Sequence, residues 1–517
     1  MSASIPFRPL RAIDSRETVS SYAPATGALL GEVPVASRDD VLAVVARARK
    51  AQAAWAVLPV EERASRVLRF RDALLEQSDE LVKLLSLECG KPRQEALVHE
   101  VLTVLDLATY YAEHAARILA PQTIDLHLLK HRRSVVHFAP CGVVGVISPW
   151  NFPFVIPMGS VFEALLAGNA VVVKPSEVTP LIMKKAKEIY DSTGLPEDLF
   201  GVVVGYAETG QALIDAGIQR MIFTGSVETG KRVAAACGTR LIPCVMELGG
   251  KAPLVACADA DVERTARAIV FGGFANSGQA CISVERVYAH EKIHDALVAR
   301  VRTLVGELRQ GDPAGDVDVG AIIFAKQIAV AEDLVHDAVE RGATLVAGGK
   351  RVAGPGQFFE PTVLAGCNHT MRVMKEEIFG PVVPIQRVAS DDEAIALAND
   401  SHLGLNAYVF TKDRAKGERL AERIRAGSVV VNDVLSNYGA IEAPFGGVKQ
   451  SGFGRVHGDD SLRDMCEKRH VNVERFSLPG GDALWYPYSA KSFRWLQRGV
   501  RALFTRGGLV RKVSRFF

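Results

Sequence analysis

One cysteine of this chain lies in a stretch that suits a nucleophile. In FANSGQACIS (274–283), Cys281 follows small residues, and Gly278 and Ala280 leave room for the backbone to turn and for a substrate to reach the sulfur. A lone cysteine is more often a small, packed core residue. The thiol therefore predicts catalysis only if other segments supply a base and an oxyanion donor.

Two polar residues elsewhere can supply those groups. Glu247 follows an apolar run in VMELGGKAP (245–253), and a carboxylate that lines a cleft can activate water as a general base. Asn151 lies between prolines in ISPWNFPF (147–154), which cannot continue a helix or a central strand, and its amide can donate to an oxyanion. Taken alone, each has a simpler alternative: a solvated glutamate at a strand end, and an asparagine that satisfies loop backbone.

The elements that must position these residues are strands and helices in alternation. Four short apolar runs between residues 143 and 226 predict strands, and helical periodicity fills the intervals. The pattern recurs after residue 250, from a strand at 284–290 to a strand at 428–432. It predicts two successive α/β halves with parallel sheets covered on both faces, dividing near residue 248. Long helices are expected before them at 39–58, 61–88 and 94–118.

Composition and charge exclude several classes of protein. The 517 residues are 48% hydrophobic and 23% charged, as in an ordinary globular protein, and the net charge of +2 gives no electrostatic basis for binding nucleic acid. The cysteines include no C-x-x-C pair, so we expect free thiols and no metal site. The chain has no run of about 18 apolar residues, so we expect no membrane-spanning helix. The N-terminal MSASIPFRPLRAIDSRE lacks the apolar core of a signal peptide, so we expect a cytoplasmic protein.

Seven short motifs follow one another along the chain. They are PWNFP (149–153), VVVKPSE (171–177), FTGS (223–226), MELGGK (246–251), FANSGQAC (274–281), EEIFGPV (376–382) and PFGGVKQSGFGR (444–455). Together they resemble the aldehyde dehydrogenase superfamily over residues 20–473, and the 34 residues from Glu247 to Cys281 match the family's usual separation. The wording around Cys281 is most similar to bacterial members that oxidise lipophilic aldehydes.

The resemblance implies an enzyme that oxidises a small-molecule aldehyde to its carboxylic acid with NAD. Cys281 would attack the carbonyl carbon, and the Asn151 amide and the backbone N–H of Cys281 would hold the oxyanion. Loss of hydride to the nicotinamide would give a thioester, which water activated by Glu247 would hydrolyse. The alternative, an inactive structural or binding protein with the same fold, would be signalled by loss of Cys281 or Glu247, and both are present.

The same resemblance places the cofactor, although the chain has no G-x-G-x-x-G motif. Ser226 follows a predicted strand at a helix N-terminus, where backbone N–H groups and the helix dipole suit a pyrophosphate. Lys174 and Glu177 would face the adenosine ribose, and Glu177 would repel a 2′-phosphate, which favours NAD, with NADP as the alternative. The full expected set is Trp150, Lys174, Ser176, Glu177, Gly225, Ser226, Leu248, Gly249, Glu377 and Phe379.

Residues beside the catalytic ones predict the substrate class. Phe152, Phe154 and Ile282 are apolar. Relatives that oxidise succinic semialdehyde often carry an arginine at the position of Ala275. The resemblance therefore favours an apolar aldehyde, medium- or long-chain or aromatic, with succinic semialdehyde or another small semialdehyde as the alternative.

By resemblance the fold class is α/β, an aldehyde dehydrogenase-like fold with a Rossmann-like cofactor domain, an α/β catalytic domain and a β oligomerisation arm. The arm would join subunits into a homodimer or homotetramer, and HRRSVVHF (131–138) alternates polar and apolar residues as an arm strand would. The expected boundaries are 1–118 and 141–248 for the NAD-binding domain, 249–455 for the catalytic domain, 119–140 and 456–473 for the arm, and 474–517 for a C-terminal tail.

The tail contains a segment whose apolar and basic residues separate on a helix. Residues 491–515 hold eight basic residues and no acidic one. This pattern is typical of a helix on an anionic surface, so peripheral contact with the inner face of a membrane is one expectation. Docking over the substrate entrance or on a neighbouring subunit are the alternatives, and LWYPYS (484–489) is expected to be anchored by buried rings. The apolar face would carry Phe493, Leu496, Val500, Leu503 and Phe504, opposite Arg494, Arg498 and Arg501.

Overall fold

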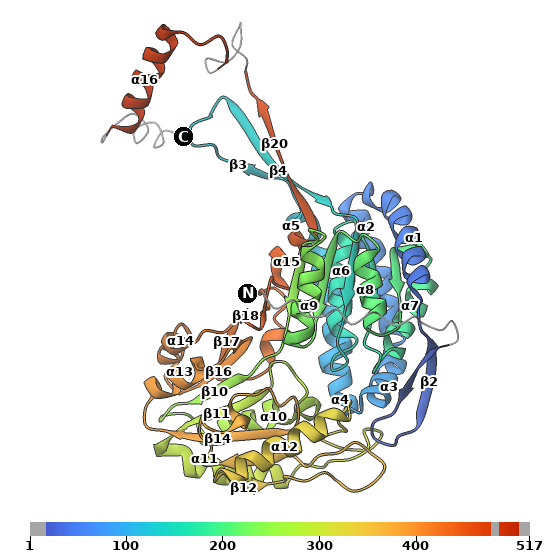
Figure 1. Cartoon of the computed structure of the whole chain (residues 1–517), viewed down its shortest axis with the longest axis vertical. Helices are drawn as coiled ribbons and strands as arrows, with labels where there is room; N and C mark the ends of the chain where they lie inside the picture. Colours follow the sequence, from blue (N-terminus) through green and yellow to red (C-terminus); the bar gives the residue numbers. More distant parts are fainter. Residues whose placement is uncertain (1–16, 477–484, 506–517) are drawn as a thin grey trace, which may run out of the picture. The chain divides into compact units, whose positions relative to one another are not determined.

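The computed structural model of the chain describes residues 17–476 and 485–505 (Figure 1). They form two compact units: a large one, made of the chain up to Ile118 together with Pro140–Cys466, and a small one, made of Leu119–Ala139 and the chain from Glu467 onward. None of the described helices is both long and apolar enough to span a membrane. All the residues expected above to be catalytic or cofactor-binding lie in the large unit.

A six-stranded sheet forms the first half of the large unit. Five strands run parallel in the order β9-β8-β5-β6-β7, and β19 pairs antiparallel with β9 at the edge. The central strands are buried because α1, α8 and α9 cover one face and α6 and α7 the other. The strands are β5 (Val143–Ile147), β6 (Ala170–Lys174), β7 (Phe200–Val202), β8 (Arg220–Thr224), β9 (Cys244–Glu247) and β19 (Gly452–Phe453); the helices are α1 (Arg38–Ala56), α6 (Val155–Leu166), α7 (Leu181–Ser192), α8 (Ala207–Asp215) and α9 (Val227–Gly238).

A seven-stranded sheet forms the second half, in the order β12-β13-β14-β11-β10-β16-β17. Neighbouring strands of this sheet run parallel, except for β12 and β13, which are antiparallel to each other. Leu254 and Val255 are adjacent on β10 but belong to apolar clusters on opposite faces, so this sheet is also buried on both sides. The strands are β10 (Ala252–Ala256), β11 (Val284–His290), β12 (Thr344–Ala347), β13 (Thr362–Ala365), β14 (Val382–Val388), β16 (Asn406–Phe410) and β17 (Ser428–Val431); the helices are α10 (Val262–Phe274), α11 (Glu291–Gly306), α12 (Lys326–Glu340), α13 (Asp391–Asn399) and α14 (Arg414–Ala421).

The connection between β9 and β10 carries two of the expected cofactor residues, Leu248 and Gly249. Glu247 is the last residue of β9, the edge parallel strand of the first sheet, and β10 of the second sheet begins at Ala252. The fold class predicted from the alternation of strands and helices is confirmed. Smaller pairs of strands complete the large unit: β1 (Thr18–Tyr22) with β2 (Leu29–Pro34), and β15 (Leu403–Gly404) with β18 (Val448–Lys449).

The N-terminal helices depart from the sequence expectation in two places. The helix expected over 61–88 is interrupted at Gln77, between α2 (Val60–Glu76) and α3 (Ser78–Cys89). The helix expected over 94–118 contains a π-helix, η1 (Ala96–Leu102), between α4 (Arg93–Glu95) and α5 (Thr103–Ile118). Such wider turns often occur at functional sites.

The sequence interval 456–473 is divided between the two units. Helix α15 (Gly458–Asp464) packs against α5 and α6 in the large unit and buries Leu462. Strand β20 (Cys466–Glu474) lies almost wholly in the small unit, where it forms a sheet with β3 (Gln122–Ile124) and β4 (Arg132–Pro140). Strand β20 begins at Cys466, and the small unit takes up the chain again at Glu467.

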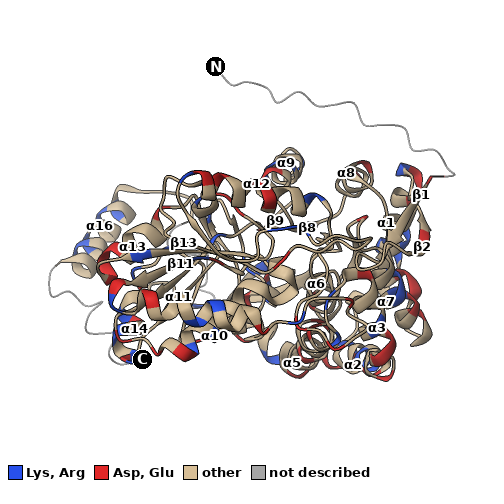
Figure 2. Cartoon of the chain, turned by 90° about the horizontal axis from the view of Figure 1, so that it is seen from below, with Lys and Arg blue, Asp and Glu red and all other residues tan. Residues whose placement is uncertain are grey.

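Helix α16 (Ala490–Phe504) is strongly amphipathic and carries no acidic residue (Figure 2). Ser489 caps it by accepting a hydrogen bond from the N–H of Ser492 at 3.0 Å. Phe493, Val500 and Phe504 are all more than half exposed. The expected burial of the rings in 484–489 is wrong for the single chain, because Trp485, Tyr486 and Tyr488 are exposed. The expected continuation of the helix over 506–515 lies outside the described residues.

Candidate active site

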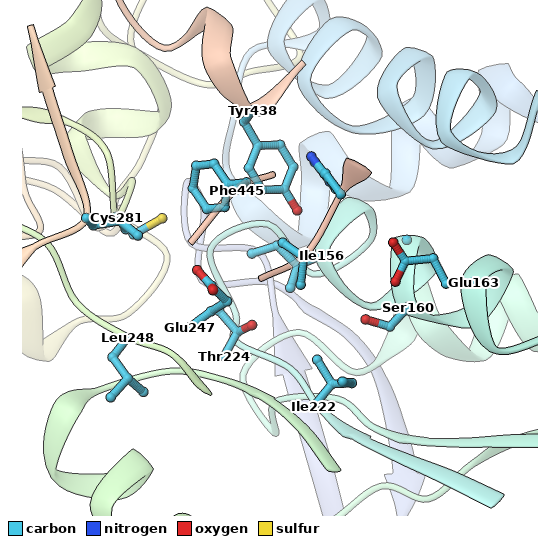
Figure 3. A pocket seen from close by; sticks show the side chains of 14 residues that line it. Ile156, Ser160, Glu163, Ile222, Thr224, Glu247, Leu248, Cys281, Tyr438 and Phe445 are labelled. Atoms are coloured by element: carbon cyan, nitrogen blue, oxygen red, sulfur yellow. The ribbon is translucent and has the colours of Figure 1, made fainter. Parts of the chain in front are cut away.

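A pocket in the large unit brings Cys281 and Glu247 together (Figure 3). The sulfur of Cys281 points into it, and Glu247 enters from the end of β9. Apolar side chains form much of the remaining wall, including Ile156, Tyr438 and Phe445. A thiol and a carboxyl group in one largely apolar pocket are the groups that acyl transfer followed by hydrolysis requires.

The loop before Cys281 is held in a strained conformation. Asn276, Ser277 and Gly278 have φ angles of 51°, 56° and 72°. These angles lie in the left-handed region of backbone conformation, which residues other than glycine rarely adopt. The Asn276 N–H donates to Oε2 of Glu95 at 2.9 Å, and Ser277 Oγ donates to the carbonyl of Gly320 at 3.0 Å. Strain of this kind persists where surrounding contacts fix it, as at active sites.

Two glycines allow the close packing around these groups. A Cβ on Gly250 would overlap the carbonyl oxygen of Cys281, so only glycine lets the β9–β10 connection pass this close to the nucleophile. A Cβ on Gly446 would lie 2.6 Å from Oε1 of Glu247. The glycines of two separate motifs therefore shape the surroundings of the thiol and of the carboxyl group.

Asn151 is buried beside the Cys281 loop. Its Nδ2 donates one hydrogen bond, to the carbonyl of Gln279 at 2.9 Å, which leaves the second amide hydrogen for a ligand. Its own carbonyl accepts from Asn276 Nδ2 and from Lys91 Nζ, both at 3.0 Å. The loop expected to carry an oxyanion donor is thus bonded directly to the loop of the nucleophile.

A buried ion pair fixes the other side of the Asn151 loop. Lys91 Nζ lies 2.6 Å from Oε1 of Glu100 on the π-helix, and neither side chain is exposed. The second oxygen of Glu100 accepts from the N–H groups of Phe154 and Val155, at 3.1 and 2.8 Å. These contacts hold the first turn of α6 and, through it, Asn151.

Burial raises the pKa of both reacting groups in the free protein. Burial and then the nearby Glu247 raise the pKa of Cys281 to about 12. Burial also raises the pKa of Glu247 well above its usual range, which Arg455 only partly opposes. Neither oxygen of Glu247 has a hydrogen-bond partner among the described residues. A cationic group entering the pocket would favour the thiolate.

The residues expected to hold the adenosine and pyrophosphate lie at the carboxyl ends of strands in the first sheet. Ser226 caps α9 by accepting from the N–H of Thr229 at 3.3 Å, and Gly225 directly precedes it, after β8. Lys174 ends β6, and its Nζ lies 3.5 Å from Oε2 of Glu177. Ser176, between them, accepts from the N–H of Val178. Ligands of open α/β sheets bind at this edge, and a helix N-terminus there suits a pyrophosphate.

The residues expected at the nicotinamide end gather near Cys281. Oε1 of Glu377 accepts from the N–H of Gly250 at 2.9 Å, and burial followed by the charge of Glu285 raises the pKa of Glu377 to about 8. A Cβ on Gly249 would overlap the Glu377 carboxyl group. Leu248 lines the pocket itself.

Two aromatic rings adjoin this end. Phe379 has a φ of 51° and packs edge-on against Trp150, with ring centroids 5.4 Å apart. The N-terminus of α9 suits the pyrophosphate of a dinucleotide. The carboxylates of Glu177 and Glu377 suit its ribose hydroxyl groups, and the rings of Phe379 and Trp150 lie at the end expected to hold the nicotinamide.

Sequence reasoning missed several residues that organise the site. Gln279 is fully buried; its Nε2 donates to the carbonyl of Asn276 at 2.8 Å, and its Oε1 accepts from the N–H of Ile323 at 2.8 Å. Lys91 and Glu100 were likewise assigned no role. Gln279 could have been found from the sequence, because it is a polar residue inside the FANSGQAC motif.

Known proteins resemble this chain along most of its length. 4,4'-Diapolycopene aldehyde oxidase of Methylomonas sp is 38% identical over 483 residues, which cover 92% of this chain and 89% of that protein. A protein of Mycolicibacterium smegmatis assigned as an NADP(+) succinate-semialdehyde dehydrogenase is 39% identical over 467 residues, 90% of each chain.

Solved structures share the fold. The NAD-dependent aldehyde dehydrogenase of Sinorhizobium meliloti superposes with a TM-score of 0.87 at 35% identity, covering 92% of this chain and 95% of that one. An aldehyde dehydrogenase of Mycobacterium tuberculosis complexed with NAD+ gives a TM-score of 0.84 at 35% identity, covering 90% and 96%. The sequence profile of the aldehyde dehydrogenase family matches residues 11–471. The chain therefore belongs to the aldehyde dehydrogenase family.

Proposed function

We propose that the protein oxidises an apolar aldehyde to the carboxylic acid with NAD. The observation that supports this most is the joint presence of Cys281 and Glu247 in a pocket with a largely apolar wall. A protein that had kept the fold but lost the activity would not need a thiol and a carboxyl group in the same pocket.

In the first half of the reaction, the thiolate of Cys281 adds to the aldehyde carbon and opens its C=O double bond. The negative charge on the former carbonyl oxygen is stabilised by the free amide hydrogen of Asn151 and by the backbone N–H of Cys281. The contacts of Asn151 with Gln279 and Lys91 hold that amide in place before the substrate arrives. A nicotinamide held beside the pocket would supply the hydride acceptor, and the acyl group stays on Cys281 as a thioester.

In the second half, Glu247 removes a proton from a water molecule as the water adds to the thioester carbon. The C–S bond breaks, the carboxylic acid leaves, and Cys281 departs as a thiolate. The buried position of Glu247 suits this role, because desolvation makes its carboxylate a stronger base than one in water.

The cofactor would be held by the residues at the sheet edge and beside the pocket. Ser226 and the first turn of α9 would receive the pyrophosphate, Lys174 and Glu177 the adenosine ribose, and Glu377 the nicotinamide ribose. Oε2 of Glu177 lies 3.5 Å from Nζ of Lys174. If both residues face the adenosine ribose as proposed, the Glu177 carboxylate would repel a 2′-phosphate. NAD is therefore the proposed cofactor. The relative assigned as an NADP(+) enzyme makes NADP the alternative.

The substrate class follows from the lining of the pocket. Among the residues that line it, none is a lysine or an arginine that could pair with a distal carboxylate. Ala275 is buried and small at the position discussed above. These features favour an apolar aldehyde over succinic semialdehyde, and one relative is named for a diapolycopene aldehyde.

The formation of NADH with four aldehydes tests this function. We expect turnover with hexanal, dodecanal and benzaldehyde at kcat/KM values at least about tenfold above that with succinic semialdehyde. The reverse order would support the semialdehyde reading, and no turnover with any of them would support an inactive member of the family.

The small unit and α16 suggest how the protein associates. We propose that the β3-β4-β20 sheet joins subunits into a homodimer or homotetramer. We also propose that α16 contacts an anionic membrane surface, since its exposed face carries Phe493, Val500 and Phe504 and its other face carries Arg494, Arg498 and Arg501.

A further inference from the structure

A second carboxyl group lines the pocket of Glu247 and takes no part in the steps above. Glu163 projects from α6 on the side of the pocket opposite Cys281 (Figure 3) and is 1% exposed. Its Oε2 accepts from Ser461 Oγ at 2.9 Å, while Oε1 makes no hydrogen bond of good geometry with any described residue. Burying a half-paired carboxyl group costs stability, so its place in the pocket needs an explanation.

The groups that face Glu163 set its acidity. Burial dominates and raises the pKa of Glu163 to about 7. Tyr111 of α5, together with Ser461 and the N–H of His457, favours the carboxylate, whereas the charge of Asp464 on α15 opposes it. From the pocket side the facing titratable groups are Cys281, Glu247 and Tyr438. Glu163 can therefore both gain and lose a proton near neutral pH.

His457 is the other titratable side chain at this end of the pocket. Its φ of 64° is strained for a residue other than glycine. The centroids of its ring and the Tyr438 ring lie 4.7 Å apart, and its Nδ1 has no hydrogen-bond partner among the described residues. Burial lowers the pKa of His457 to about 4, so the ring stays neutral. It can pass a proton on, but it cannot store one at neutral pH.

Hydrolysis of the thioester creates a need for such an acceptor. The proton taken from water remains on Glu247, whose oxygens lack protein partners within the described part of the chain. Until Glu247 loses that proton, it cannot act as a base in the next turnover. Thr224 and Ser160 add hydroxyl groups to the pocket wall, and water among them can carry the proton (Figure 3).

We propose that Glu163 accepts the proton from Glu247 after each hydrolysis. The transfer converts the Glu247 carboxylic acid and the Glu163 carboxylate into the Glu247 carboxylate and the Glu163 carboxylic acid, with no redox change. Glu163 then releases the proton to solvent. The inference rests on the proposed thioester chemistry of Cys281 and assigns a second carboxyl group to its hydrolytic half.

Hydrolysis of p-nitrophenyl acetate isolates this half, because the ester acylates a reactive thiol without any cofactor. The wild-type protein should release a burst of nitrophenolate equal to the enzyme, followed by a slower rate that rises with pH through about 7 as Glu163 loses its proton. Glu163→Gln should keep the full burst, lower the later rate about tenfold and remove that rise.

Two further variants separate acidity from shape. Glu163→Asp keeps a carboxyl group and should restore most of the later rate. Ser461→Ala removes a hydrogen bond that favours the carboxylate, so the midpoint of the rise should move to higher pH.

The possible outcomes distinguish failure of the Glu163 proposal from failure of the proposed thioester chemistry. A Glu163→Gln protein with a full burst and an unchanged later rate and pH profile would overturn the proton-acceptor role. Equal losses of burst and later rate would overturn it too, because Glu163 would then be structural. A burst that persists in Cys281→Ser would instead contradict the proposed function itself.

Discussion

At the scale of single residues, the pocket combines a thiol and two carboxyl groups that are all less acidic than usual because they are buried. Their chemistry therefore depends on which charged groups enter the pocket, more than on fixed charges around it. In the proposed mechanism, Cys281 supplies the covalent bond, Glu247 activates water, and Glu163 accepts the proton from Glu247. Each role predicts a different defect.

The first defect concerns hydrolysis. Glu247→Gln keeps the shape of the side chain but cannot take a proton from water, so acylation should proceed and release of the acid should slow about 100-fold. Stopped-flow measurement with an apolar aldehyde and NAD should show one NADH per active site and then little turnover. An unaltered steady rate would show that another group activates the water.

The second defect concerns the cofactor. Glu177→Gln removes the carboxylate proposed to oppose a 2′-phosphate, so the ratio of kcat/KM for NAD to that for NADP should fall about tenfold. Glu76→Gln, at the exposed end of α2, is the matched control. A ratio that changes equally in both variants would mean that Glu177 does not select the cofactor.

The motifs of the sequence led to Cys281, Glu247 and Asn151, which the structure places in and beside one pocket. They did not lead to Glu163, although it is the single charged residue of α6. Its partners, Tyr111 and Ser461, lie far from it in the chain, so only folding reveals that they meet.

At the scale of secondary-structure elements, the catalytic loops depend on elements that precede the first sheet. The π-helix η1 presents Glu100 both to Lys91 and to the start of α6, so one buried carboxylate links three segments. The glycines of the β9–β10 connection then allow that connection to pack against the Cys281 loop.

Breaking this ion pair should affect both stability and rate. Lys91→Met leaves Glu100 as an unpaired buried charge, which should lower the free energy of unfolding by about 3–5 kcal/mol. It should also reduce kcat, because the carbonyl of Asn151 loses a donor. Urea denaturation and steady-state kinetics measure the two effects.

The double variant Lys91→Met/Glu100→Gln removes both charges and serves as the control. It should recover part of the lost stability but not the rate. A Lys91→Met protein within about 1 kcal/mol of wild type would show that the pair is unimportant for stability.

The sequence pattern predicted the strands well because buried parallel strands are continuous apolar runs, as in AVVVK of β6. It did not predict the π-helix or α15. The turn width of η1 and the packing of α15 on α5 and α6 are set by tertiary contacts, which local periodicity does not encode.

At the scale of the whole molecule, the chain consists of a large unit that holds the candidate active site and a small unit that includes an amphipathic helix. Helix α16 leaves aromatic and aliphatic side chains exposed, which is unusual for a surface with no partner. Its basic face would add attraction to the anionic membrane surface proposed above.

Removal of residues 491–517 should therefore abolish sedimentation with vesicles that contain anionic lipid, while turnover of a short aldehyde stays within about twofold of wild type. The triple variant Arg494→Gln/Arg498→Gln/Arg501→Gln keeps the apolar face and is the matched comparison. It should bind such vesicles about 100-fold more weakly, as expected for a loss of about 1 kcal/mol per basic residue.

Unchanged vesicle binding by the truncated protein would rule out the membrane role of α16. If the truncation instead altered the preference for aldehyde chain length, the helix would be assigned to the substrate entrance.

The most direct test of the central proposal is the mass of a trapped intermediate. Glu247→Gln protein, mixed with NAD and dodecanal, quenched in acid and digested, should yield one peptide whose mass has increased by the acyl group, and fragmentation should place that group on Cys281. Acylation of any other residue, or of none while NADH accumulates, would contradict the account.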